Sequence, residues 1–336
     1  MNLITGATGL TGAHLALHLL NNGENVRAIY RTENSIQKTR QLFDLYDARE
    51  SFDKIDWRQA DVTDIPALEE AFAGVSHVFH CAAAISFNRE DEEELRKTNI
   101  EGTANIVNLC LAHGVKKLCH VSSVAAVGDP LPGEKEVTEK CEWNPAVHHH
   151  DYAISKYGAE MEVWRGWQEG LEVAIVNPGI IIGPGFWGSG SGQIFSTVKK
   201  GMKVYTLGVT GYVSVWDVAN ILHRLMHSTI DGERFILVSE NLTYRRVIDL
   251  VAEELKVKKP DAHALSWLTS LGWRIDWLFS LFGKKRLLSR DGAHSLHKKT
   301  FYSSDKIKKT LTFDFMPIEE AIKKTVRIQS RQRNGN

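Results

Sequence analysis

The feature that most constrains this chain is a glycine-rich segment near its beginning. Three glycines spaced by three residues, Gly6, Gly9 and Gly12, follow a short apolar run at positions 3–4. A helical pattern of apolar residues then continues to Asn22. A strand, a turn without bulky side chains and a helix N-terminus together can cradle a phosphate group, because free backbone N–H groups approach the anion closely. The segment therefore predicts a nucleotide-binding turn.

The glycine spacing alone leaves a second interpretation open. It is G-x-x-G-x-x-G rather than the commoner G-x-G-x-x-G, and a tight strand-to-helix turn without a ligand also uses glycines. The rest of the chain favours binding, because strand-like and helical patterns alternate and so predict a parallel sheet covered on both faces. We expect strands at 25–30, 55–60, 77–81, 117–121 and 173–177, and helices at 37–46, 65–72, 92–112 and 152–169.

Composition narrows the class of partner. Hydrophobic residues make up 43% of the 336 residues and charged residues 24%, as in ordinary globular proteins, and the net charge of zero argues against nucleic-acid binding. No apolar stretch is long enough to span a membrane, and no signal peptide precedes the first strand. We therefore expect a cytoplasmic protein that acts on a small molecule without membrane association.

No metal site is expected from the sequence. The four cysteines form no C-x-x-C pair and have no zinc-like spacing. The run His148-His149-His150 has no carboxylate or cysteine partner at ligand spacing, and adjacent histidines in an extended segment point to different sides. We expect this run to be a loop near the active site.

The regular alternation ends after Pro178, where a glycine-rich segment occupies 179–192. A connection of this length more often carries function than merely joins two elements. We expect residues 1–178 to form a dinucleotide-binding domain, with a strand near 212–240 returning to it, and 179–330 to be mainly a substrate-binding region. The aromatic segment 265–282 is expected to pack or to cap a substrate pocket, with attachment to a membrane surface as the alternative.

A tyrosine and a lysine mark a candidate reaction centre. Tyr152 and Lys156 are four residues apart, which places them on one face of the expected helix. A nearby ammonium lowers the pKa of a phenol and makes it useful for proton transfer. Ser123 follows the strand expected at 117–121, at the sheet edge where ligands bind. A second such pair, Tyr302 and Lys306, has no strand before it, and we expect it at the start of a surface helix.

Taken together, these motifs resemble the extended short-chain dehydrogenase/reductase (NAD-dependent epimerase/dehydratase) family, and within it the dihydroflavonol-reductase and 3β-hydroxysteroid-dehydrogenase-like branch. The resemblance implies an α/β fold, with a doubly wound parallel sheet (Rossmann) and a smaller mixed α/β C-terminal substrate region. It implies that Tyr152 exchanges a proton with the substrate oxygen and that Ser123 hydrogen-bonds this oxygen. Lys156 would bind the nicotinamide ribose and tune the tyrosine, and Asn99 would support the lysine through a proton relay.

The resemblance also assigns the residues that bind the cofactor. They are Gly6, Thr8, Gly9, Leu10, Thr11, Gly12, Arg31, Asp61, Val62, Cys81, Ala82, Ala83, Ser122, Tyr152, Lys156, Asn177, Pro178 and Gly179. An acid at the end of the second strand would bind the ribose 2′-hydroxyl of NAD, whereas an arginine accommodates a 2′-phosphate. Arg31 stands there, so NADP is favoured over NAD.

The expected reaction is reduction of a ketone or aldehyde, because NADP favours a net reductase. Dehydratases of the family place acidic residues beside the catalytic hydroxyl, whereas here Ser123 is followed by Val124-Ala125. The substrate is expected to be small and largely apolar. Its candidate contacts are Phe87, Phe186, Trp187 and Tyr212.

Two alternative functions stay open. One is a nucleotide-sugar epimerase with tightly bound NAD, and the other is a non-catalytic NADP-sensing protein. Because the family often pairs through the helices expected at 92–112 and 152–169, the resemblance also implies a homodimer.

Overall fold

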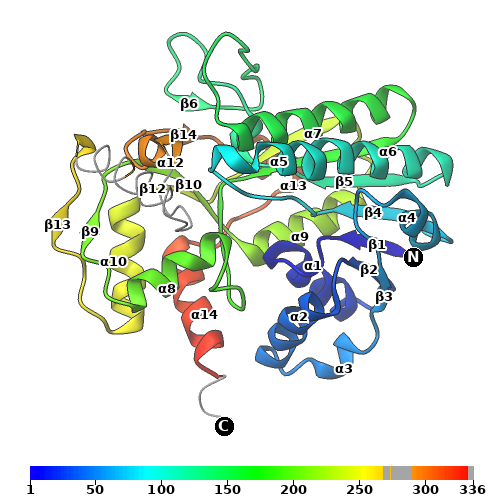
Figure 1. Ribbon diagram of the computed structural model, residues 1–336, viewed down its shortest axis with the longest axis horizontal. Coiled ribbons are helices and arrows are strands. Elements are labelled where there is room, and N and C mark those ends of the chain that lie inside the picture. The colour runs from blue at the N-terminus through cyan, green and yellow to red at the C-terminus, as the bar shows by residue number, and fades with distance from the viewer. Residues whose placement is uncertain (268–272, 274–289, 332–336) are drawn as a thin grey trace.

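A computed structural model of the chain describes residues 1–267, 273 and 290–331. Its main sheet consists of β1 (Asn2–Thr5), β2 (Val26–Tyr30), β3 (Asp56–Gln59), β4 (His77–His80), β5 (Lys117–Val121), β7 (Glu172–Pro178) and β11 (Glu233–Leu237). The spatial order is β11-β7-β5-β4-β1-β2-β3, and every neighbouring pair is parallel (Figure 1). The order reverses direction at β1, which is the doubly wound arrangement. The expected fold class is confirmed.

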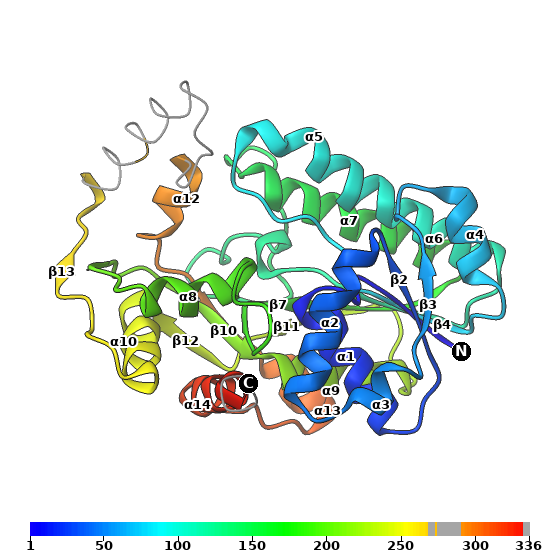
Figure 2. The same cartoon turned by 60° about the horizontal axis from the view of Figure 1, so that its bottom comes forward.

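Helices cover both faces of this sheet (Figure 2). One face carries α4 (Ile65–Phe72), α5 (Glu92–Leu95), α6 (Gly102–Ala112) and α7 (Asp151–Gln168); the other carries α1 (Leu10–Asn21), α2 (Glu33–Leu45) and α9 (Val215–Met226). Leu3 and Ile4 on β1 are both fully buried, but they belong to different hydrophobic clusters. Successive strand residues point to opposite faces, so a central parallel strand needs the uninterrupted apolar run that the sequence shows.

A smaller region lies beside the main sheet. Its sheet is formed by β8 (Ile180–Ile182), β10 (Val209–Ser214) and β12 (Glu240–Thr243), with β10 in the middle. The helices α8 (Gln193–Lys199), α10 (Tyr244–Leu255) and α14 (Ile318–Arg331) contribute to one hydrophobic cluster with this sheet. Between β10 and β12 the chain passes through α9 and β11. The edge strand β11 of the main sheet therefore lies in the interval 212–240.

Short elements complete the described chain. They are α3 (Arg49–Phe52), β6 (Glu136–Val137), β9 (Val204–Tyr205), β13 (Ala262–His263), α12 (Arg290–Ser295), β14 (Phe301–Tyr302) and α13 (Asp305–Leu311), with single turns η1 (Arg89–Asp91), η3 (Val124–Ala126) and η4 (Gly190–Gly192). Among the described residues, no helix has the length and apolar character that crossing a membrane requires.

Two sequence expectations differ from the structure. The helix expected at 92–112 is interrupted by the π-helical turn η2 (Arg96–Glu101). The expectation that Tyr302 stands at the start of a surface helix is wrong. Tyr302 lies on β14, which pairs with β6, and α13 begins only at Asp305. Burial raises the pKa of the Tyr302 hydroxyl, because its ring packs against the β10 backbone at Gly211. Most of the aromatic segment 265–282 lies outside the described residues.

The glycine turn after β1 packs against backbone on two sides. Gly6 has a φ of +70°, and a Cβ on it would lie 2.6 Å from the Ala82 nitrogen in the segment after β4. A Cβ on Gly12, the third residue of α1, would lie 2.4 Å from the Gly6 carbonyl oxygen. At Gly9 the nearest atom would be 3.4 Å away, an ordinary contact. Close approach of backbone therefore explains Gly6 and Gly12, whereas Gly9 has space for a side chain.

This difference predicts a stability effect. We expect Gly12→Ala to lower the free energy of unfolding by about 1–3 kcal/mol, because the added methyl group forces backbone to move. The matched variant Gly9→Ala should stay within about 1 kcal/mol of the wild type. Urea denaturation of cofactor-free protein, followed by circular dichroism, measures both values. Equal losses in the two variants would contradict the packing argument.

Candidate functional site

The residues expected to bind a cofactor lie at one edge of the main sheet. Each group follows the carboxyl end of a different strand, and parallel strands end at the same edge. The groups are 6–12 after β1, Arg31 after β2, Asp61-Val62 after β3, 81–83 after β4, Ser122 after β5 and 177–179 at the end of β7. The structure thus brings together residues that are distant in the sequence.

Arg31 stands at the end of β2 with most of its side chain exposed. Its Nε lies 3.9 Å from Asp61 Oδ2, and the side chain is 67% exposed. The other Asp61 oxygen accepts hydrogen bonds from the backbone N–H of Thr63, at 2.9 Å, and from its hydroxyl, at 2.7 Å. An exposed ion pair of this length contributes little energy. The guanidinium is therefore accessible to an anion at this edge.

Tyr152 and Lys156 project from the first two turns of α7. The helix begins after His150, whose Nδ1 accepts a hydrogen bond from the Ala153 N–H at 3.0 Å. The Tyr152 hydroxyl lies near the side chain of Ser123. Lys156 is fully buried, and its Nζ donates to the Val121 carbonyl of β5 at 3.0 Å. The predicted serine, tyrosine and lysine therefore share one site.

Burial sets the protonation of this pair. It raises the pKa of Tyr152, and the interaction with the Ser123 side chain opposes this change. It lowers the pKa of Lys156 to about 8, against the attraction of the Glu160 carboxylate. Near neutral pH the phenol consequently holds its proton while most of the ammonium is charged. The arrangement can donate a proton from Tyr152 and stabilise the charge that is left behind.

Asn99 connects the segment after β4 to α7. It lies in the π-helical turn η2 and is buried. Its Oδ1 accepts from the Ala84 N–H at 2.7 Å, and its Nδ2 donates to the Ala84 carbonyl at 3.0 Å and to Ser155 Oγ at 2.9 Å. The Ser155 hydroxyl in turn donates to the Tyr152 carbonyl at 2.9 Å. These hydrogen bonds hold the backbone on either side of the site, and support of Lys156 by Asn99 through a proton relay stays a prediction.

A buried histidine extends this connection to the glycine turn. His80 at the end of β4 has its Nδ1 2.7 Å from Thr5 Oγ1 and its Nε2 2.9 Å from Thr103 Oγ1. The Thr103 hydroxyl donates to the Asn99 carbonyl at 2.5 Å, so it must accept from His80. Nε2 therefore carries the proton and Nδ1 accepts from Thr5. Burial lowers the pKa of His80 to about 3, and the ring is neutral.

Glu160 is a buried charge that the sequence analysis missed. It lies one turn after Lys156 and is 0% exposed. Its Oε1 accepts from Asn177 Nδ2, and its Oε2 lies 3.6 Å from Arg234 Nη1 on β11. Asn177 Nδ2 also donates to the Ser123 carbonyl at 2.9 Å. Burial raises the pKa of Glu160, while Arg234 and Asn177 act in the opposite direction. The available signal was its position four residues after Lys156 on the same helix face.

The four expected substrate contacts lie in different surroundings. Phe87 is 44% exposed, and its ring centroid is 5.8 Å from that of Tyr152. Phe186 is buried in a cluster with Ala13 and Leu42. Trp187 stacks on Phe195 with ring centroids 5.1 Å apart, and Tyr212 is fully buried in the smaller region. The structure thus places Phe87 beside the site and the other three in packed surroundings.

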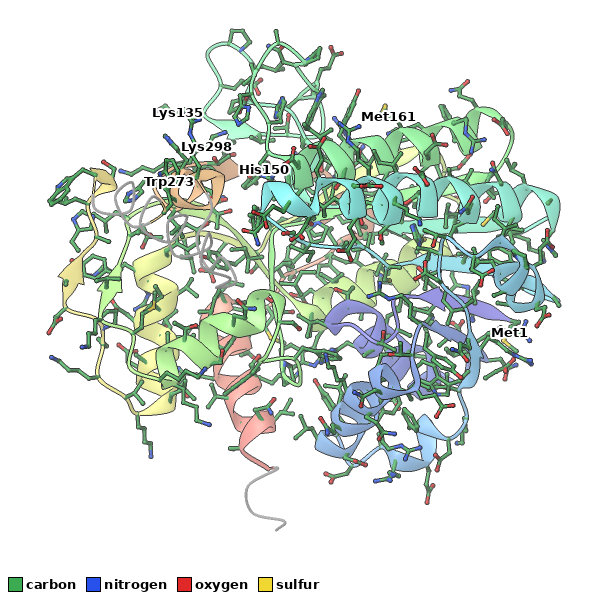
Figure 3. All side chains as sticks on the ribbon, in the orientation of Figure 1. Met1, Lys135, His150, Met161, Trp273 and Lys298 are labelled. Carbon is green, nitrogen blue, oxygen red and sulfur yellow. The ribbon has the colours of Figure 1, made fainter. Side chains whose placement is uncertain are left out.

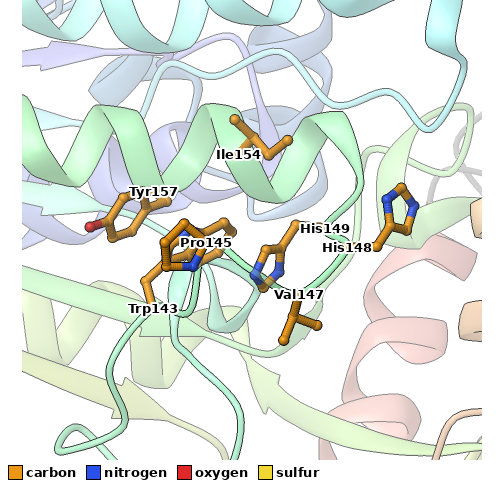
Figure 4. Close-up of a pocket in the computed structure, with 7 residues that line it drawn as sticks. All are labelled: Trp143, Pro145, Val147, His148, His149, Ile154 and Tyr157. Carbon is orange, nitrogen blue, oxygen red and sulfur yellow. The ribbon is translucent and has the colours of Figure 1, made fainter.

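A separate cavity of 360 Å³ lies between α7 and the loop before it. Figure 4 shows its residues, which are Trp143, Pro145, Val147, His148, His149, Ile154 and Tyr157. The Trp143 ring stacks on His149 at 3.7 Å and on Tyr157 at 4.5 Å between centroids. Tyr157 thus points toward this loop, whereas Lys156 reaches β5. The histidine run packs in a loop that leads directly into α7.

Glu160 allows a matched test of buried charge. We expect Glu160→Ala to lower the free energy of unfolding by about 3–5 kcal/mol, because it leaves Arg234 without its carboxylate. Glu162→Ala removes a carboxylate from the same helix that pairs with Arg165 near the surface, and should cost less than about 1 kcal/mol. Chemical denaturation at neutral pH measures both. A loss at Glu160 no larger than that at Glu162 would rule out a stabilising role for the buried contacts.

Known proteins share this chain's sequence pattern and fold. A protein of Synechocystis sp., provisionally named dihydroflavonol 4-reductase, is 27% identical over 329 residues, which cover 95% of this chain and 91% of the relative. Sterol demethylase protein B of Methylococcus capsulatus is 30% identical over 254 residues, covering 75% and 73%. Cinnamoyl-CoA reductase 1 of Petunia hybrida is 28% identical over 251 residues, covering 72% and 73%.

Solved structures agree with these sequence matches. The crystal structure of gox2253 has a TM-score of 0.80 at 29% identity, covering 99% of this chain and 98% of the other. A UDP-glucose 4-epimerase of Thermotoga maritima has a TM-score of 0.76 at 21% identity, covering 99% and 100%; this likeness shows the fold alone. The model of the NAD dependent epimerase/dehydratase family matches residues 2–237. The chain therefore belongs to the NAD dependent epimerase/dehydratase family.

Proposed function

We propose that this protein is an NADP-dependent reductase that converts a ketone or aldehyde of a small, largely apolar substrate into an alcohol. One observation carries the proposal. The Tyr152 hydroxyl lies near Ser123, one helical turn from the buried Lys156, at the sheet edge that also holds the glycine turn. A proton donor, a second hydroxyl and a fixed positive charge are what carbonyl reduction requires of the protein.

The chain's residues fit a dinucleotide. Side chains on Gly6 and Gly12 would collide with backbone, so the two glycines let the turn pack closely. The N-terminus of α1 follows this turn, and its N–H groups can bind a pyrophosphate. The reduced cofactor would supply the hydride that bonds to the carbonyl carbon. Tyr152 gives its phenolic proton to the carbonyl oxygen, which becomes the alcohol hydroxyl. Ser123 positions this oxygen, and the Lys156 ammonium stabilises the tyrosinate that remains.

The relatives favour reduction over the alternatives. Two of those reported above carry reductase names and cover at least 72% of this chain. The epimerase is similar in fold alone. The presence of both Tyr152 and Lys156 in one site supports an enzyme rather than a cofactor sensor. Phe87 gives the site one apolar contact beside Tyr152, which suits an apolar substrate.

The preference for NADP rests on Arg31. Its exposed guanidinium lies at the end of β2, where the ribose of a dinucleotide is bound in folds of this kind. Paired hydrogen bonds from a guanidinium to a phosphate are strong and geometrically specific. The weak contact with Asp61 orients Arg31 without consuming its donors.

The proton donor can be tested with two tyrosines of the same helix. We expect Tyr152→Phe to lower kcat for carbonyl reduction by about 10²–10⁴-fold with cofactor affinity retained, because the variant lacks the proton. Tyr157→Phe, whose ring faces Trp143, should keep the wild-type rate. A panel of ketones and aldehydes, followed by loss of NADPH absorbance, provides the assay. Unchanged turnover in Tyr152→Phe would refute the mechanism, and purification with tightly bound NAD would favour an epimerase.

Cofactor preference can be tested at Arg31. We expect wild-type protein to prefer NADPH, and Arg31→Ala to raise the KM for NADPH by about 10–100-fold, since charge-assisted hydrogen bonds contribute about 1.5–3 kcal/mol. The KM for NADH should not change. Arg58→Ala, an exposed arginine on the adjacent strand β3, serves as the control. A wild-type preference for NADH, or equal effects of Arg31→Ala on both cofactors, would overturn the assignment.

A further inference from the structure

A cluster of histidines lies at the opposite edge of the main sheet from Tyr152. Figure 3 labels residues near the two edges: His150 precedes α7, and Met1 precedes β1. Glu24, in the connection between α1 and β2, lies near Met1 through its contact with Asn2. His223 is in the last turn of α9, and His227 follows directly. None of these groups belongs to the proposed reduction site.

Three potential ligand atoms converge in this cluster. Glu24 Oε1 lies 2.6 Å from His223 Nε2 and 2.8 Å from His227 Nε2. All three atoms are within 4.8 Å of one another. A zinc ion with bonds of about 2.0–2.2 Å to two imidazoles and a carboxylate needs ligand atoms slightly farther apart than these hydrogen bonds. Small rotations of the three side chains would provide that spacing.

Each of two ligands is already oriented by a second group. His223 Nδ1 lies 3.0 Å from His18 Nε2 of α1, and Glu24 Oε2 accepts from Asn2 Nδ2 at 2.6 Å. Histidines that bind metals usually donate their other ring N–H to a nearby acceptor, which fixes the ring and its tautomer. His18 can accept that proton when His223 Nε2 binds a metal. The cluster thus resembles a metal site in its outer contacts as well as its ligands.

The surroundings suit a divalent cation. The side chains of Glu24 and His223 are 18% and 20% exposed, whereas that of His227 is 49% exposed and leaves a path from solvent. The C-terminal ends of α1 and α9 meet here, and their partial negative charge favours a cation. Lys116 and the chain's amino group lie near the adjacent His77 and oppose binding in part.

We propose that Glu24, His223 and His227 form a binding site for a divalent transition metal ion of the zinc type, with water as a fourth ligand. Two imidazoles and one carboxylate are a donor set that zinc accepts in tetrahedral geometry. The ion joins the connection after α1 to the end of α9. It therefore fastens the helix that follows the glycine turn to the helix that leads from the smaller region into β11.

Direct metal binding tests this site. Full-length protein without an affinity tag is treated with a chelator, dialysed and titrated calorimetrically with ZnCl₂ near neutral pH. We expect one equivalent to bind, and Co²⁺ alone to give the visible absorption of a tetrahedral complex. Glu24→Gln and His227→Asn should each weaken binding by more than about tenfold, and His18→Asn by about 10–100-fold. Zinc should raise the thermal midpoint of the wild type more than those of Glu24→Gln, His227→Asn and His18→Asn.

The controls separate this site from other histidines. The double variant His148→Asn/His149→Asn removes two of the three histidines of the run before α7, away from the proposed site. It should bind zinc like the wild type. Circular dichroism and thermal midpoints without metal show that each variant is folded. Absence of saturable binding in the wild type would overturn the proposal. Binding that survives in Glu24→Gln and His227→Asn, or that is lost in the double variant, would also overturn it.

Discussion

A buried chain of hydrogen bonds through His80 is the interaction on which the site depends. Thr5 at the end of β1 donates to His80, His80 donates to Thr103, and Thr103 donates to the Asn99 carbonyl. The Asn99 side chain then continues to Ser155 on α7. In a low-dielectric interior such a chain is costly to break. A buried polar group without a partner has given up its hydrogen bonds to water and gains none in return. The glycine turn and α7 are consequently placed by the same set of contacts.

Buried charges form a second set of constraints on α7. Lys156 and Glu160 occupy the same face, and each has partners on a different strand: Val121 for the lysine, and Asn177 and Arg234 for the glutamate. Neither charge could be buried alone without a large loss of hydration energy. Their attraction keeps Lys156 more basic than burial by itself would allow. The lysine near Tyr152 thus depends on a carboxylate that has no described contact with the tyrosine.

The sequence predicted the parallel sheet from local pattern, whereas most residues at its carboxyl edge were assigned by resemblance to the family. Apolar runs define the strands, and the parallel arrangement then brings Arg31, Asp61 and Ser123 to one edge. The contacts of His80, and those of Glu160 with Asn177 and Arg234, could not be predicted in this way, since these partners are far away in the chain. Phe186 and Tyr212 show a different limit of the sequence. Their aromatic side chains suggested a substrate pocket, but aromatic side chains also favour burial in a hydrophobic core, where the structure places both.

The π-helical turn at Arg96–Glu101 has a consequence for how this chain can change. A π-turn holds one residue more than the corresponding α-helical turn, so deleting a residue there would restore a continuous α-helix. The repaired helix would have better backbone hydrogen bonds. However, each residue of an α-helix turns the chain by about 100°, and the residues on one side of the deletion would rotate by that amount relative to the other. Asn99 and Thr103 could then not both keep their partners. Selection for a more regular helix and selection for the connected site are opposed at this one position.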